Sequence, residues 1–327
     1  MSAVSSPAER SITKLQGFLL LLGAVLIWGI QPLGMKIVLK VFSYPTAACL
    51  RSMSAAVFFA IFLTIIAKRK SRGTPPPEMP RKAYLWWLVG GLGLGVSNFF
   101  WSAALYHTTV GATSILQLAC SVVLAIYGIF FLAEKCTPLR TVALLTALFG
   151  MFLVTWNGHD LSDLVNSRYF LGNMFGLLGA LGWSICGIAQ KNIVQYRSST
   201  VVVAPLVIIS GLSLVLPALL GGPATVAPIN WLAVALLILT GLAGVGVANI
   251  CFSQAMIALP ASFGAVMLTI SPLIGMTCGI IFLGEPFTPY LMLGAPLASA
   301  GVAISFLAMP NDSVEATTFS QEAVVET

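Results

Sequence analysis

Charged residues are scarce in this chain. Asp, Glu, Lys and Arg make up 8% of its 327 residues, and apolar residues make up 58%, whereas soluble domains carry roughly 25% charged residues. A water-soluble protein of this length needs more polar surface than these side chains provide. The scarcity of charge therefore excludes a secreted enzyme, a cytosolic enzyme, a nucleic-acid binder and a disordered protein.

Histidine is rare in this chain, and closely paired cysteines are absent. The chain has only two histidines, His107 and His159, and none of its six cysteines belongs to a Cys-x-x-Cys pair. Most of the cysteines lie inside apolar runs, where a thiol packs as a small apolar group. The sequence therefore predicts no metal site and no cofactor.

Long apolar runs fill most of the chain. A transmembrane helix takes about 20 apolar residues, so ten helices use about 200 residues. Apolar runs bounded by charged residues, Pro or Asn predict spans at 15–36, 44–67, 84–105, 111–133, 139–156, 171–191, 199–220, 231–256, 262–283 and 289–308. This pattern predicts an all-α integral membrane protein in contact with membrane lipid and without a nucleic-acid partner.

The basic residues predict the orientation in the membrane. If the N-terminus is cytoplasmic, twelve Lys and Arg residues lie in inner segments and three in outer ones, and Arg51 lies within a span. Such an excess of basic residues is typical of the cytoplasmic side. We therefore expect a cytoplasmic N-terminal segment at 1–14 and a cytoplasmic acidic tail at 309–327. The short loops favour a bacterial inner membrane.

An internal repeat relates the two halves of the chain. Residues 93–154 match residues 244–305 without a gap when the sequence is shifted by 151 positions. The junctions 131–138 and 282–289 both contain Phe-Leu-x-Glu followed by Thr-Pro, which similar composition alone does not explain. Further matches are Asn98 with Asn249, Ser102 with Ser253 and Gly150 with Gly301.

Each copy of the repeat contains five predicted spans, and an odd number reverses the orientation of the second copy. Inverted repeats are a hallmark of secondary transporters, whose binding site lies near the midplane between the halves. The sequence thus predicts two inverted five-helix repeats that can open alternately to each side. The repeat-related helix-end acids are then expected at opposite faces, Glu134 inside and Glu285 outside.

Several other motifs accompany the two junctions. They are Trp28-Gly29 and Lys36 in the first span, Arg51 in the second, and Ala104-Leu105-Tyr106 at the end of the third. Together these residues resemble the EamA-type transporters of the drug/metabolite transporter (DMT) superfamily. The resemblance implies ten helices in two halves, at 15–156 and 171–308. It also implies export of a solute, which in relatives is an amino acid, another metabolite or a drug.

Three basic residues lie within predicted spans or at their ends. A charged residue near the centre of a span costs about 2.5–3.5 kcal/mol on insertion scales, which makes it a functional candidate. Arg51 either faces the cavity and binds a substrate carboxylate, or it reaches the outer interface or ties helix ends together. Lys36 and Lys191 lie nearer to span ends, and for them we favour a side chain that reaches the interface.

Uncharged residues must line any solute path, because no Asp or Glu lies in the middle of a predicted span. Asn98 and Trp101 share a helix face, as do Gln117 and Ser121. The alternative for each residue is a hydrogen bond between helices, worth about 0.6 kcal/mol on average. The path candidates are Gln31, Asn98, Trp101, Gln117, Ser121, Trp183, Gln190, Asn249, Gln254 and Ser271.

These features favour a secondary transporter for a small-molecule solute. We expect an exporter of amino acids or related small metabolites, because tryptophans and amides suit zwitterions with apolar side chains. An exporter of drugs or other solutes stays open, as does a sensor, a channel or an intramembrane enzyme on the same helical fold. An enzyme would need a Ser–His pair, an Asp–Asp pair or His-Glu-x-x-His at membrane depth, so we predict no catalytic residue.

The lack of acidic residues within the spans gives a first prediction. Small multidrug exporters of the same superfamily exchange drug cations for protons at a buried glutamate, and nothing in this sequence matches that residue. A permanent drug cation should therefore cause no alkalinisation of vesicles that contain the protein, with empty vesicles as the baseline. Drug-driven alkalinisation would contradict this prediction.

Overall fold

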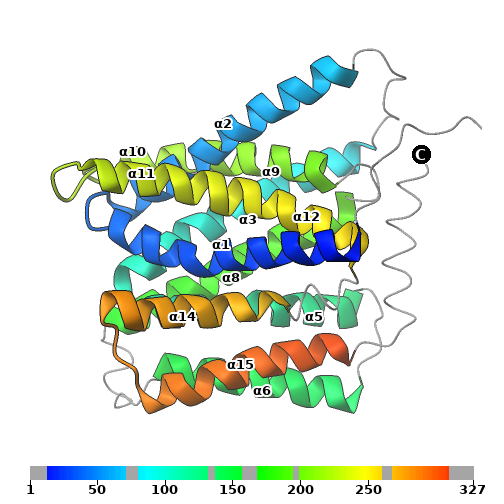
Figure 1. The fold of residues 1–327 in the computed structure, drawn as a ribbon, viewed down its shortest axis with the longest axis vertical. Coiled ribbons are helices and arrows are strands. Elements are labelled where there is room, and N and C mark those ends of the chain that lie inside the picture. The colour runs from blue at the N-terminus through cyan, green and yellow to red at the C-terminus, as the bar shows by residue number, and fades with distance from the viewer. Residues whose placement is uncertain are drawn as a thin grey trace, which may run out of the picture.

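The computed structural model describes residues 13–70, 80–131, 137–156, 168–193, 199–259 and 267–308. These ranges are mostly helical and contain no β-strand; their one β-type pairing is an isolated bridge between Phe42 and Thr225. Most of the helices lie side by side with their long axes roughly parallel, and α2 is inclined to the others (Figure 1). The all-α fold predicted from the sequence is confirmed for the described part of the chain.

The first half of the chain forms the helices up to residue 156. Their bounds are α1 (Lys14–Val38), α2 (Tyr44–Lys70), α3 (Arg81–His107), α4 (Val110–Leu116), α5 (Ala119–Phe131) and α6 (Pro138–Trp156). Helix α1 begins with a capping box, in which the Thr13 hydroxyl accepts a hydrogen bond from the Gln16 N–H. The described residues of the predicted span 111–133 form α4 and α5, which a turn at Gln117 and Leu118 separates.

The second half forms the remaining helices. Their bounds are α8 (Arg168–Ile193), α9 (Ser199–Ser213), α10 (Val215–Leu220), α11 (Trp231–Leu239), η1 (Thr240–Val247), α12 (Ala248–Ala258), α14 (Ile270–Leu283) and α15 (Pro289–Leu307). Helices α9 and α10 are separated at Leu214, because Pro217 has no N–H to donate to the carbonyl of Ser213. The glycine-rich segment η1 is a π-helix between α11 and α12.

Several of these segments are long and apolar enough to cross a membrane. Seven such segments lie in the described ranges: Lys14–Val38, Tyr44–Ile65, Arg81–His107, Val110–Phe131, Tyr169–Gln190, Val201–Leu220 and Trp231–Phe252. Shorter apolar helices occupy the other three predicted spans, at Pro138–Val154, Ile270–Leu283 and Pro289–Ser305. The start of the predicted span 262–283 lies outside the described residues. The protein is therefore a multi-pass membrane protein, and the total of ten spans stays a prediction.

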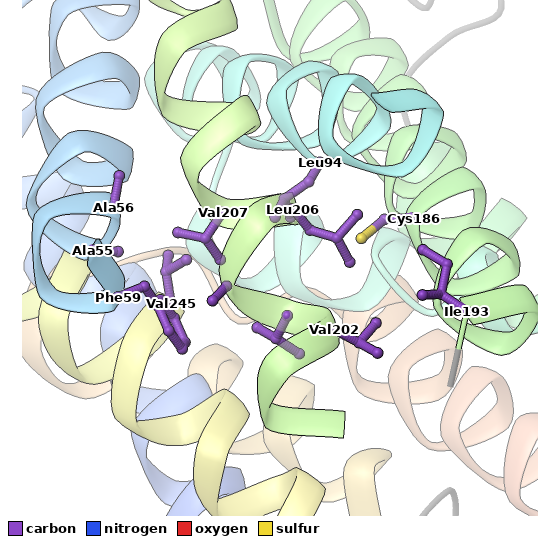
Figure 2. Close-up of a cluster of buried hydrophobic side chains, with 12 residues drawn as sticks. Ala55, Ala56, Phe59, Leu94, Cys186, Ile193, Val202, Leu206, Val207 and Val245 are labelled. Atoms are coloured by element: carbon purple, nitrogen blue, oxygen red, sulfur yellow. The ribbon is translucent and has the colours of Figure 1, made fainter. Parts of the chain in front are cut away.

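A cluster of buried apolar side chains surrounds α9. Figure 2 shows side chains of α9 between α2 on one side and α3 and α8 on the other. Phe59 of α2 and Leu206 of α9 are fully buried in this cluster. The free thiol of Cys186 is buried beside them, where it packs as a small apolar group.

Glycines allow α6 and α15 to lie in close contact. A Cβ atom added to Gly150 would collide with the backbone of Ala298, and one added to Gly301 would collide with the backbone of Ala147. Gly150 and Gly301 occupy the same position in the two repeats, so the same close approach occurs twice along this helix pair. In lipid, small residues at helix contacts promote association because they let the backbones come close.

Substitution of Gly150 tests this packing. Gly150→Leu should lower the free energy of unfolding by about 1–3 kcal/mol, because the larger side chain overpacks the α6–α15 contact. Gly23→Ala is the matched control, since a Cβ there meets nothing within 4 Å and Ala favours a helix over Gly. Thermal unfolding in detergent measures both variants. Equal melting temperatures of Gly150→Leu and wild type would contradict the close approach.

Candidate functional site

Arg51 lies inside the helix bundle, about two turns from the start of α2. Its side chain is only 3% exposed. Nη1 donates a hydrogen bond to Oδ1 of Asn98 at 2.8 Å, and Nη2 donates to Oε1 of Gln31 at 2.9 Å. These two bonds join α1, α2 and α3 around one guanidinium. The Arg51 side chain therefore points into the bundle and not toward the outer interface.

An aromatic ring covers the face of the guanidinium. Cζ of Arg51 lies 4.7 Å from the centroid of the Trp101 ring, which is the geometry of a cation–π contact. Asn98 and Trp101 are three residues apart on α3, so both side chains are on the helix face that contacts Arg51. We call Gln31, Arg51, Asn98 and Trp101 the Arg51 cluster.

The Arg51 cluster contains no negative charge. Gln31 and Asn98 are neutral amides, and Nε of Arg51 is buried without a hydrogen-bond partner. Glu285 is the only acidic residue in the part of the chain that the structure describes, and its carboxylate accepts bonds from the start of α4. A buried cation without a counter-ion is costly in a membrane. The cluster is therefore a candidate binding site for an anionic group.

A second set of residues holds the Arg51 cluster in place. Nδ2 of Asn98 donates to Oγ of Ser210 on α9 at 3.3 Å. Oε1 of Gln31 occupies the space in which a Cβ at Gly244 of η1 would lie. The indole N–H of Trp28 donates to the carbonyl of Gly244 at 2.8 Å. Only glycine fits at this point of η1, because the Gln31 carboxamide lies directly against the backbone.

The other path candidates make local contacts. Nε2 of Gln190 donates to Sγ of Cys186 at 3.3 Å within α8, and Nδ2 of Asn249 in α12 donates to the carbonyl of Val245 at 2.9 Å, one turn earlier in η1. Trp183 packs against the apolar cluster around α9. Asn98 and its repeat-related residue Asn249 thus have different bonding partners. The remaining candidates are partly buried at the α4–α5 turn, in α5, in α12 and in α14: Gln117, Ser121, Gln254 and Ser271.

The charged residues at span ends have separate positions. Nζ of Lys36 donates to the carbonyls of Leu105 and Thr108, both at 2.5 Å. A cation at a helix C-terminus satisfies carbonyls that lack helical partners and interacts favourably with the helix dipole. Lys36 therefore ties α1 to the end of α3 instead of extending free to the interface. The side chain of Lys191 and the whole of Glu134 lie outside the described residues.

Sequence reasoning missed two residues that support the cluster. The repeat singles out Gly244, because this residue matches Gly93. The match does not show that Gly244 contacts Gln31. Ser210 is one of several hydroxyl residues in the otherwise apolar helix α9, and the sequence does not indicate its contact with Asn98. Within the described ranges, no group of three or more His, Cys, Asp or Glu could hold a metal ion.

The comparisons with known proteins agree with this architecture. The EamA-like transporter family matches residues 15–156 and 170–307. The Escherichia coli K12 protein described as "Uncharacterized inner membrane transporter YhbE" is 28% identical over 189 residues, which is 56% of this chain and 56% of that protein. The chain thus spans little more than half the length of this relative.

Two further similarities cover more of the chain. The Bacillus subtilis protein described as "Uncharacterized transporter YoaV" is 23% identical over 284 residues, which is 86% of this chain and 94% of that protein. A solved structure titled "Crystal structure of protein" superposes with a TM-score of 0.60 at 20% identity and covers 92% of this chain and 98% of that one. At this level of identity, the superposition shows a shared fold.

The uncompensated charge of Arg51 can be tested by supplying a carboxylate. Gln31→Glu should raise the free energy of unfolding by about 1–3 kcal/mol, since a hydrogen bond between charged groups replaces one to a neutral amide. Gln190→Glu is the matched control: the described bond of Gln190 is to a thiol, so a carboxylate there should lower the stability. Thermal unfolding in detergent measures both. A loss of stability in Gln31→Glu would show that the Arg51 charge is already balanced.

Proposed function

Because the chain belongs to the EamA-like transporter family, we propose that it is a secondary transporter that exports amino acids or related small metabolites. In this proposal the solute binds at the Arg51 cluster. Two five-helix halves expose that site alternately to the two sides of a bacterial inner membrane. The relatives described as transporters support the general activity, and the chemistry of the cluster supports the class of solute.

The observation that carries the proposal is the bonding of the Arg51 guanidinium. It donates to two neutral amide oxygens and keeps a buried Nε without a partner. Guanidinium presents several N–H donors in one plane, which matches the two oxygens of a carboxylate. A solute carboxylate would supply the negative charge that the cluster lacks. This chemistry favours amino acids and other small carboxylates.

The arrangement of the helices supports alternating access. The sequence repeat relates α1 to α8, α2 to α9, α3 to η1 and α12, α5 to α14, and α6 to α15. Helix α1 packs against α12 and α14, and α8 packs against α3 and α5. Helix α2 packs against η1, and α9 packs against α3. Matching contacts of this kind are what a two-fold relation between two halves produces.

Export of cationic drugs receives less support from the structure. A drug cation would need an acidic or aromatic site that is free of positive charge. In the described ranges, the ring of Trp101 already faces a guanidinium, and the carboxylate of the single acidic residue, Glu285, accepts hydrogen bonds from the start of α4. Anionic and zwitterionic solutes therefore remain the preferred class.

Counterflow in proteoliposomes tests the proposal. Labelled amino acids should exchange saturably across vesicles that contain the wild-type protein. Arg51→Ala should lower the exchange rate by about tenfold or more, since loss of a charge-assisted hydrogen bond costs about 1.5–3 kcal/mol. Arg51→Lys should retain part of the activity with a raised KM, because a lysine keeps the charge and loses the planar pair of donors.

Arg81→Ala is the control for the loss of a positive charge, because Arg81 is exposed at the start of α3. This variant should exchange solute at the wild-type rate. Undiminished exchange in Arg51→Ala would exclude Arg51 from the binding site. Absence of exchange for every amino acid with the wild-type protein would exclude amino acids as the solute.

A further inference from the structure

Two charged side chains hold the corner between α3 and α4. Lys36 donates to the last carbonyls of α3. On the other side of the corner, Oε1 of Glu285 accepts a hydrogen bond from the N–H of Val110 at 2.6 Å, and Oε2 accepts one from the N–H of Gly111 at 3.1 Å. The Glu285 carboxylate thus joins the start of α4, in the first half of the chain, to the connection between α14 and α15, in the second half.

The chain around Glu285 is shaped for this contact. Gly284 is the C-cap of helix α14, and its φ of 65° is a left-handed conformation that glycine adopts without strain. The N–H of Glu285 then donates to the carbonyl of Gly279 at 3.2 Å. A Cβ at Gly279 would collide with Oε2 of Glu285, so this glycine leaves the space that the carboxylate occupies. The same spacing of Gly and Glu recurs in the first repeat as Gly128 and Glu134.

We propose that Glu285 is a latch that closes this end of the bundle and, as an inference that rests on the proposed transport function, that transport requires its bonds to α4 to break. Glu285 and its partners on α4 belong to opposite halves of the chain, so the contact exists only while the halves meet at this end. When the bonds break, the carboxylate and the N–H groups lie at helix ends, where water can replace each lost partner. The contact can therefore form and break reversibly. The basic residues predict that this end is the outer one.

Ser114 is a suitable reporter for opening of the latch. It lies one turn beyond Val110 on α4 and is 6% exposed. A Cβ at Gly275 of α14 would collide with the Ser114 hydroxyl, so the two helices meet at this point. If the halves separate at the latch, water should reach residue 114 from that side of the membrane.

Labelling of a single cysteine tests the latch. The six native cysteines are replaced by alanine, Ser114 is replaced by cysteine, and a membrane-impermeant maleimide is added to right-side-out and inside-out vesicles. Glu285→Gln should raise the labelling rate from one face by about tenfold, the change in an equilibrium that corresponds to about 1.4 kcal/mol. Gly279→Ala leaves Glu285 unsubstituted. It should raise the labelling rate from the same face, because the added methyl group displaces the Glu285 carboxylate from α4.

Glu134→Gln is the matched control, since the repeat predicts this acid at the opposite face. It should not raise labelling from the Glu285 face. An unchanged rate in both Glu285→Gln and Gly279→Ala would overturn the latch, and so would an equal rise with Glu134→Gln. If Glu285→Gln does not fold, as judged by size-exclusion chromatography, Gly279→Ala decides the question. The assay needs no solute, so a failure to find counterflow leaves its result intact.

Discussion

The buried guanidinium of Arg51 constrains the positions of the helices around it. A positive charge in a membrane interior must be met by oriented acceptors, and here these acceptors come from Gln31 on α1 and Asn98 on α3. Both amides must then hold a fixed position, which requires Ser210 on α9 and a bare backbone at Gly244 on η1. The contacts around this one charge therefore fix the relative positions of α1, α2, α3, α9 and η1.

Apolar contacts complete the bundle in a different way. Lipid is as apolar as a leucine side chain, so helices in a membrane gain little from burial alone and depend on close packing. Gly150 and Gly301 provide such packing between α6 and α15, which lie side by side (Figure 1). This contact joins the two halves through closely packed backbones. The halves thus share a close backbone contact at α6 and α15 and a polar contact at Glu285, and polar groups at a helix end can exchange their partners with water.

Much of the fold could be predicted from local properties of the sequence. Apolar runs show the helices, and the repeat shows that the halves are related. Helix interruptions were harder to predict, because a run such as 231–256 is continuous in composition while the structure divides it into α11, η1 and α12. The turn at Gln117 and Leu118 likewise falls within an uninterrupted apolar run. Such interruptions depend on neighbouring helices that composition does not reveal.

The sequence by itself determined that this protein is an all-helical membrane protein with repeat-related halves, and that Arg51 is unusual, because composition, periodicity and charge are properties of the chain alone. The tertiary structure decided which groups that arginine meets. Glu285 shows the same division: the repeat identifies the residue, but its partner Val110 lies 175 positions away. Contacts over such distances form only when separate helices pack, so the identity of the partners was decided by the fold.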